Sequence, residues 1–317
     1  MRYCPRCGSE VEEDSIYCEF CGMRLEGTPI IRKPPLHPPE TTLESIIEAF
    51  RSLFVPTPHI RHPSPAVYET LPRYTPIKKY LIIGVILTVI GLTLTTFGIW
   101  IKFLGFTIVA FTSPAILLIW MYYNDRFERE PLSLIALTFG WGVISTFPAL
   151  IVNTLMRWPP PFAALVEEPL KILGVYWLAK HKTLGKEFND HLDGMVYGAA
   201  AGAGFAGTEN ILYIVRFAPK IGALTIIILR SITPISHMVF TAIAGRSLGI
   251  AKVRKGKINA KDLIPGLAAA ITLHFLWNIS SIISITILLP AYIMILTKLV
   301  REAQRDEILW GLAARTL

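Results

Sequence analysis

The segment Phe162-Ala-Ala-Leu-Val-Glu-Glu-Pro-Leu-Lys-Ile-Leu-Gly-Val-Tyr-Trp-Leu178 is apolar enough to belong to a membrane span, yet it contains two adjacent glutamates, Glu167 and Glu168. A carboxylate at membrane depth costs about 3 kcal/mol or more, so such residues usually have a function. Later apolar segments contain Glu209, His237 and His274, whose side-chain types transfer protons or bind metals. The combination indicates an enzyme whose active site lies inside the bilayer.

The composition is that of an all-α polytopic membrane protein. Of the 317 residues, 52% are hydrophobic and only 17% are charged, against about 25% charged in soluble domains. Long apolar runs separated by short loops fit this class. The net charge of +8 does not favour nucleic-acid binding, because many basic residues fall in those loops, where they set topology. The first residues contain no apolar run, so we expect no cleavable signal peptide.

Residues 1–26 are expected to form a small zinc ribbon. The only four cysteines of the chain, Cys4, Cys7, Cys18 and Cys21, form two Cys-x-x-Cys knuckles, each followed by glycine. Four thiolates at this spacing match a closed tetrahedral site for structural Zn²⁺. Two disulfides or a rubredoxin-like iron site are the alternatives. The small surface and long linker of the module suggest that it docks a cytosolic protein partner. Nucleic acid is a poor ligand, because acidic residues offset the arginines of the module.

Residues 27–78 read as a proline-rich linker that contains one amphipathic stretch, 42–54. Its apolar side chains share one helical face, so the helix is expected either to lie on the membrane surface or to pack on the zinc ribbon. Residues 79–301 are the predicted transmembrane domain, and residues 302–317 a cytosolic tail. We expect about eight spans, at 80–101, 104–123, 131–156, 161–179, 193–217, 232–251, 263–283 and 285–300.

Loop charges predict the orientation in the membrane. With the N-terminus inside, basic residues concentrate in the inner loops near residues 126–129, 180–186 and 252–261, which follows the positive-inside rule. Both termini are therefore expected in the cytoplasm of a multi-pass cell-membrane protein. The cysteines then lie in a reducing compartment, which favours zinc over disulfides.

Residues 221–250 are too long for one span, since about 45 Å of helix exceeds a hydrocarbon core of about 30 Å. Arg230 and Pro234 interrupt this stretch, so we expect a short outer piece at 222–229 and a spanning helix from about Ile232. With that break, Glu167, Glu209, His237, His274 and Asn278 all lie about 8 to 14 Å below the outer ends of their helices. The polar groups are thus predicted to form one layer.

Spacing within the helices supports that layer. Lys171 follows Glu167 and Glu168 by four and three residues and can pair with either carboxylate. His274 and Asn278 are four apart, as are Phe205 and Glu209, and small residues around 198–207 permit close helix contact. Each polar residue can also be read as structural. In that reading the Glu168–Lys171 pair is a salt bridge, Asn153 and Asn210 join helices, and Arg230 extends to the interface.

The polar motifs around Glu167, Glu209, His237 and His274 follow one another along the chain in a specific order. In this order and spacing the sequence resembles the PrsW family of intramembrane proteases, which is related to the CAAX prenyl protease and bacteriocin-processing (CPBP) superfamily. The likeness covers roughly residues 80–285, and the superfamily's second motif often ends in histidine where this chain has Glu209. The motifs are Glu167-Glu168-Pro-Leu-Lys171, Phe205-Ala-Gly-Thr-Glu209-Asn210, His237, and His274-Phe-Leu-Trp-Asn278, with Asp125–Leu132 and Asp193–Gly198 as flanking elements.

The expected activity is hydrolysis of peptide bonds in membrane protein or peptide substrates. Glu167 is the predicted general base on a water molecule, with Glu209 helping to hold that water. His274 and Asn278 are the predicted oxyanion donors, and His237 orients the water or protonates the leaving amine. Glu168 and Lys171, with Phe205 and Asn210, support them.

Three alternatives remain open from the residues alone. In the first, Glu209, His237 and His274 bind a catalytic Zn²⁺ and Glu167 stays the base. In the second, the chain is a proton-coupled transporter that uses the carboxylates as a relay. In the third, it is a non-catalytic membrane scaffold whose zinc ribbon recruits a partner.

Overall fold

The computed structural model describes residues 2–3, 10–11, 41–57, 76–125 and 129–315. Near the N-terminus, β1 (Arg2–Tyr3) pairs antiparallel with β2 (Glu10–Val11). The four cysteines and the predicted zinc site lie outside the described residues. Everything else that is described is helical or loop, so the predicted fold class, an all-α membrane domain with a small N-terminal module, is confirmed.

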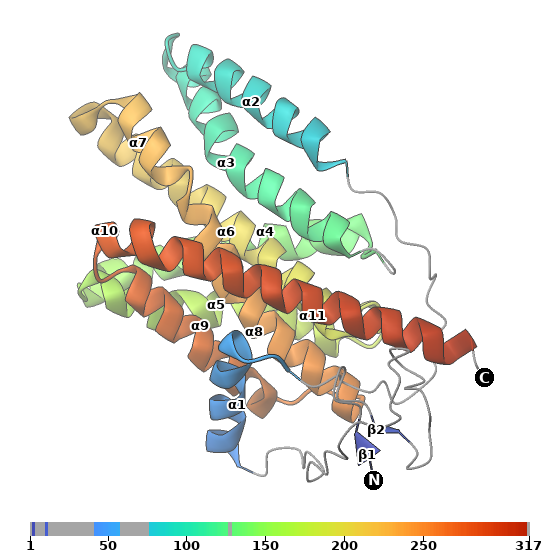
Figure 1. Cartoon of the computed structure of the whole chain (residues 1–317). Helices are drawn as coiled ribbons and strands as arrows, with labels where there is room; N and C mark the ends of the chain where they lie inside the picture. The colour runs from blue at the N-terminus through green and yellow to red at the C-terminus, as the bar shows by residue number, and fades with distance from the viewer. Residues whose placement is uncertain (1, 4–9, 12–40, 58–75, 126–128, 316–317) are drawn as a thin grey trace.

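The first helices of the membrane domain are long and apolar. α2 (Ile77–Leu94) and α3 (Ile99–Asn124) form a hairpin, and α4 (Leu132–Met156) is the next helix (Figure 1). Most side chains of α2 are exposed although they are hydrophobic, as expected for a helix that faces lipid. Five segments of the described chain are long and apolar enough to cross a membrane: these three helices, Ala223–Lys255 and Ser281–Glu307.

The remaining helices build the centre of the bundle. α5 (Ala164–Lys180) starts from a 3₁₀ turn at Pro160–Ala163, and a second turn at Leu184–Lys186 leads to α6 (His191–Ile221). α7 (Ala223–Arg230) and α8 (Thr233–Lys255) come next, and a turn at Ala260–Leu263 leads to α9 (Ile264–Trp277). α10 (Ser281–Ile283), a π turn (Ser284–Leu288) and α11 (Leu289–Arg315) complete the chain.

α6 is the central helix and packs against α3, α4 and α8. The predicted close approach is seen at its glycines: a Cβ on Gly202 would lie 2.7 Å from the carbonyl oxygen of His237, and one on Gly204 only 2.0 Å from that of Phe139. Asp190 caps the start of the helix by accepting from the amides of Leu192 and Asp193. The small residues therefore let α6 lie in backbone contact with α4 on one side and α8 on the other.

Each predicted span overlaps a helix, with differences at the ends, and the number of eight membrane spans stays a prediction. The break before His237 is confirmed, since α7 ends at Arg230 and α8 begins at Thr233. The predicted span 263–283 is too long, because α9 ends at Trp277. The last helical hydrogen bond runs from the backbone N–H of Asn278 to the carbonyl of His274. The boundary predicted between residues 301 and 302 falls inside α11, where Glu302 and Asp306 are buried.

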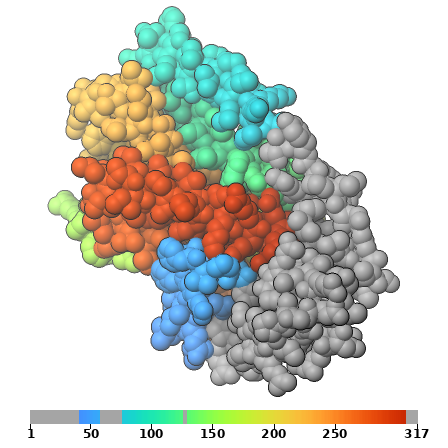
Figure 2. All heavy atoms as spheres, viewed as in Figure 1, coloured from blue at the N-terminus to red at the C-terminus, as the bar shows by residue number. Residues whose placement is uncertain are grey.

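The amphipathic helix forms as α1 (Thr42–Phe54), and it packs on α9 and α11 (Figure 2). Leu53 is buried, Arg246 of α8 donates to the Ser52 hydroxyl at 3.3 Å, and Lys298 of α11 donates to the Ser52 carbonyl at 2.7 Å. The helix therefore docks on the transmembrane bundle itself, a contact that amphipathic spacing alone does not identify. Leu43 and Phe54 remain exposed beside it.

Candidate active site

Four helices bring the predicted polar residues together. α5 carries Glu167, Glu168 and Lys171, α6 carries Glu209, α8 carries His237 and α9 carries His274, and α5 contacts each of the other three helices. Only the Glu209 side chain is appreciably accessible, at 18%, and the other five are at most 8% exposed. The six side chains therefore lie together inside the bundle, as the sequence predicts.

The six residues belong to one continuous chain of polar contacts. Arg230 donates to Glu209 Oε2 at 2.5 Å, and the same oxygen accepts from His237 Nε2 at 3.1 Å. The other nitrogen of His237, Nδ1, lies 3.1 Å from the Lys171 ammonium. Lys171 also donates to Glu168 Oε1 at 2.5 Å, which accepts from His274 Nδ1 at 2.7 Å. The chain ends where His274 Nε2 faces Glu167 Oε2 at 3.7 Å.

These contacts assign protons to the two histidines. Lys171 can only donate, so His237 Nδ1 must accept and Nε2–H must donate to the Glu209 carboxylate. Glu168 can only accept while ionised, so His274 carries its proton on Nδ1. In a neutral His274, Nε2 is therefore a lone pair that points toward Glu167.

The charges of this cluster do not balance. Lys171 matches Glu168, and Arg230 matches Glu209, while both histidines can be neutral. Glu167 is then the one carboxylate of the cluster without a cationic partner. Its Oε1 accepts from the Asn153 amide at 3.0 Å, and its Oε2 is buried with no hydrogen-bond partner among the described residues. A buried carboxylate oxygen in this state is suited to bind a proton, a water or a metal ion.

A metal ion would fit a different ligand set from the predicted one. Glu167, His237 and His274 each offer a ligand atom, and these atoms all lie within 4.8 Å of one another. The predicted set used Glu209 in place of Glu167, but Glu209 Oε2 is already held by Arg230 and His237. The acceptor atoms of Glu167 and His274 are available, whereas His237 would have to give up its contact with Lys171 or with Glu209.

Asn278 does not take the predicted place beside His274. Its amide donates to the carbonyl of Pro160 at 3.2 Å, because the residue ends α9 and its side chain reaches the turn before α5. The predicted two-residue oxyanion clamp is therefore not formed, and Asn278 supports the start of the Glu167 helix. The supporting residues do lie at the site: the Phe205 ring packs on Lys171 at 4.6 Å, and Asn210 accepts from Arg230 at 2.9 Å.

Two residues at the site were read from the sequence as structural. Arg230 was expected to extend to the interface, but its guanidinium lies on the Tyr213 ring at 4.0 Å and binds Glu209. Asn153 was expected only to join helices, and it contacts Glu167 directly. Their position just before a helix break and near a helix end was the available signal, but spacing within one helix cannot show a partner on another.

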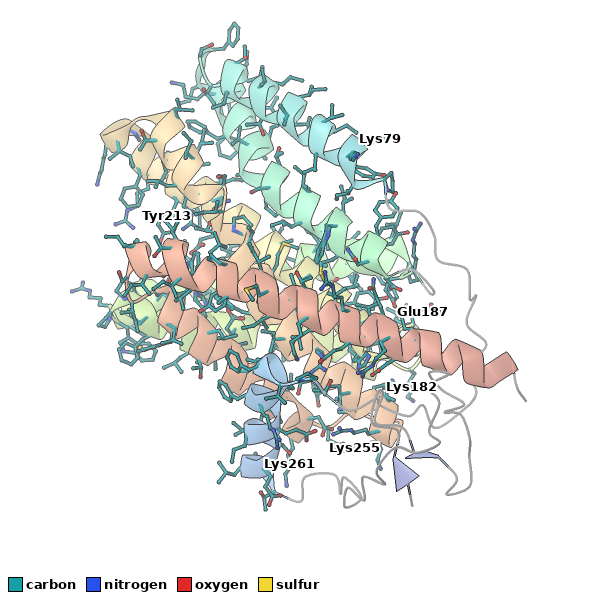
Figure 3. All side chains as sticks on the ribbon, viewed as in Figure 1. Lys79, Lys182, Glu187, Tyr213, Lys255 and Lys261 are labelled. Atoms are coloured by element: carbon teal, nitrogen blue, oxygen red, sulfur yellow. The ribbon has the colours of Figure 1, made fainter. Side chains whose placement is uncertain are left out.

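A second buried acidic cluster, Asp125, Glu130 and Asp193, lies at the other end of α4 from Asn153. Tyr197 donates to Glu130 there. Figure 3 likewise places Tyr213, beside Arg230, far from the basic residues Lys182 and Lys255, so the candidate active site and the lysine-rich loops occupy opposite ends of the bundle.

Comparison with known proteins identifies the family. A family model described as "PrsW family intramembrane metalloprotease" matches residues 130–300, more than half of the chain and all six site residues. The chain belongs to the PrsW family. It is therefore an integral membrane protein, as its apolar helices indicate. A zinc-ribbon model matches residues 3–25, which confirms the predicted N-terminal module.

Individual PrsW relatives agree with this assignment. Protease PrsW of Geobacillus kaustophilus is 33% identical over 147 residues, which cover 43% of this chain and 62% of the relative. Protease PrsW of Bacillus subtilis is 29% identical over 173 residues, which cover 50% of this chain and 74% of the relative. No solved structure matches the chain. The family supports the predicted peptidase class.

Proposed function

We propose that the chain is an intramembrane endopeptidase that hydrolyses peptide bonds of membrane-associated protein substrates. The observation that carries the proposal is the free Oε2 of Glu167, which lies 3.7 Å from His274 Nε2 inside a buried network whose other charges are paired. A carboxylate that is buried but uncommitted can take a proton from water more readily than one held by a cation.

The residues suggest an order of events. Glu167 takes a proton from water while the water oxygen bonds to the scissile carbonyl carbon. His274 is the proposed donor to the oxyanion, and since its Nδ1–H is held by Glu168, this role requires that a second proton be taken up on Nε2 before the attack. When the C–N bond breaks, Glu167 passes its proton to the leaving amine. Glu209 and Lys171 hold the two ring nitrogens of His237, so in this arrangement His237 links the two ion pairs.

A metal-dependent form of the same activity has support from the Glu167, His237 and His274 set. A bound Zn²⁺ would polarise the scissile carbonyl and acidify a water molecule. The protein itself would orient the His274 ring as a ligand. Glu168 accepts a hydrogen bond from His274 Nδ1, and a carboxylate commonly takes this place behind a histidine that binds a metal. The description of the family as metalloproteases is a further reason to test for a catalytic metal ion.

Both termini are proposed to be cytoplasmic, which places the active site toward the outer half of the membrane. The basic loops at the opposite end of the bundle support this orientation. The zinc ribbon is proposed to dock a cytosolic protein partner.

The first experiment compares wild-type protein with Glu167→Gln in detergent micelles, using a library of transmembrane-derived peptides and mass spectrometry of the fragments. Glu167→Gln should abolish cleavage. Thr138→Val is the matched control, since Thr138 is buried in α4 but bonds only to its own helix. Undiminished cleavage by Glu167→Gln would rule out the proposed chemistry.

The second experiment measures zinc after all four cysteines are replaced by serine, which removes the predicted structural site. About one remaining zinc per chain, lost on Glu167→Gln or His274→Ala substitution, would support metal-dependent catalysis. Zinc-free protein with full activity would establish the metal-free form.

A further inference from the structure

Asn153 reaches across from α4 to the proposed catalytic carboxylate. Other buried polar residues of the same helix, Thr138 and Ser145, return their hydroxyls to carbonyls of α4. The Asn153 amide instead donates to Glu167 Oε1 at 3.0 Å. An exposed or merely space-filling asparagine near a helix end would have no need of that contact, so its orientation calls for a functional explanation.

The contact also decides which way the amide group faces. A carboxylate accepts hydrogen bonds and does not donate them, so the nitrogen of Asn153 must be the atom that faces Glu167. The amide oxygen Oδ1 then points elsewhere as an acceptor. It is buried and has no hydrogen-bond partner among the described residues, and the same is true of Glu167 Oε2.

Asn153 and Glu167 are hydrogen-bonded to each other, yet each keeps a second acceptor oxygen without a partner among the described residues, which is unusual. A buried acceptor without a partner costs about 1–3 kcal/mol, and native proteins keep few of them. With a neutral His274, Nε2 is a third acceptor, 3.7 Å from Glu167 Oε2. Two hydrogen-bonded residues that each keep such a buried acceptor suit a ligand that only donates to them, such as a water with two O–H groups or a cation.

We propose that Asn153 is a catalytic residue that holds the attacking water together with Glu167. The water donates one O–H to Glu167 Oε2 and the other to Asn153 Oδ1, which leaves an oxygen lone pair for the scissile carbonyl carbon. Glu167 receives the first proton as the C–O bond forms, while the amide N–H of Asn153 keeps Oε1 in place. This role rests on the proposed function and adds a residue from a fifth helix, α4, to the site.

The test uses Asn153→Ala and Asn153→Asp in the full-length protein, with Thr138→Val as the control on the same helix. The substrate is the best-cleaved peptide of the transmembrane library, carried as an internally quenched fluorogenic probe. Both Asn153 variants should lose about 100-fold or more in kcat, with KM within about threefold of wild type. Asn153→Ala is the deciding variant, because Asn153→Asp also places a second carboxyl beside Glu167 Oε1, where the Asn153 amide now lies at 3.0 Å, and would disturb Glu167 in either role.

A second readout does not depend on turnover. The infrared difference between wild type and Glu167→Gln isolates the Glu167 carboxyl band, and this band should shift in Asn153→Ala. The thermal midpoint of that variant should stay within a few degrees of Thr138→Val. A kcat for correctly folded Asn153→Ala within threefold of wild type, or an unmoved Glu167 band, overturns the inference.

The two proposals fail separately. Activity in Glu167→Gln would reject the peptidase mechanism as a whole. Loss of activity in Glu167→Gln with normal kcat in Asn153→Ala would reject only the role of Asn153.

Discussion

Lys171 is the best place to measure what the buried network costs and contributes. Its side chain is 0% exposed, lies 2.5 Å from Glu168 Oε1 and 3.1 Å from His237 Nδ1, and packs on Phe205. Lys171→Met keeps most of the volume and removes the cation. Among the described residues, Glu168 would then keep His274 and, at 3.4 Å, the hydroxyl of Thr241 as its hydrogen-bond donors.

The expected loss follows from that geometry. Removing one partner of a buried ion pair costs about 3–5 kcal/mol, because the other charge stays buried and uncompensated. Because the hydrogen bond from His274 to Glu168 remains, we expect Lys171→Met to lose about 3 kcal/mol in the free energy of unfolding, near the lower end of this range. Adding Glu168→Gln removes the stranded charge and keeps an acceptor for His274. The double variant should therefore recover most of the lost stability, since replacing both partners is often nearly neutral.

The assay is reversible unfolding in mixed dodecylmaltoside and SDS micelles, followed by circular dichroism and by the fluorescence of the seven tryptophans. Lys252→Met is the matched control, because Lys252 donates to the carbonyls of Ala179 and Gly185 and strands no carboxylate when removed. That variant should lose about 1 kcal/mol. The reasoning is refuted if Lys171→Met loses less than the control, or if the double variant is less stable than Lys171→Met alone.

Three further predictions concern other parts of the molecule. Gly202→Ala places a Cβ 2.7 Å from a carbonyl of α8 and should destabilise by about 1–3 kcal/mol, whereas Gly140→Ala, with nothing within 4 Å, should not; the same unfolding assay decides. Arg230→Gln frees Glu209 from its cation and should lower kcat about 10- to 100-fold in the peptide assay, with a smaller effect on KM; unchanged kcat would exclude an orienting role. Burial raises the pKa of the Glu130 carboxyl, which lies outside the spans, well above its ordinary value of about 4.5. The free energy that protonated Glu130 contributes is fully present below the unfolded-state pKa of about 4.5 and is lost as pH rises through the folded-state pKa. The thermal midpoint of Glu130→Gln should therefore rise relative to that of wild type between about pH 5 and 8. A difference that stays constant over this range would contradict the prediction.

Much of the membrane domain was predictable because its signals are local. Apolar run length and helix period predict where the long helices lie, and Arg230 with Pro234 predicts the break before His237, which the structure contains between α7 and α8. The number of eight spans stays a prediction, since five segments of the described chain are long and apolar enough to cross a membrane. Helix ends were less predictable. α9 ends at Trp277, where the Asn278 side chain turns to the Pro160 carbonyl, and α11 continues past residue 301, where Glu302 and Asp306 are buried. Neither feature follows from hydrophobicity.

The residue types of the site and their common depth were determined by the sequence alone, since one-dimensional spacing sets how far each side chain lies along its helix. The direction in which each side chain turns was decided by the tertiary structure. Asn278 faces Pro160 and not the site, while Arg230 and Asn153 face inward to Glu209 and Glu167. The reason is that a partner on another helix depends on how α4, α5, α6, α8 and α9 rotate and pack together. The glutamate pair at residues 167 and 168 shows both levels. The sequence predicts two carboxylates in a membrane span, and only packing pairs Glu168 with Lys171 and His274 and leaves Glu167 with the Asn153 amide.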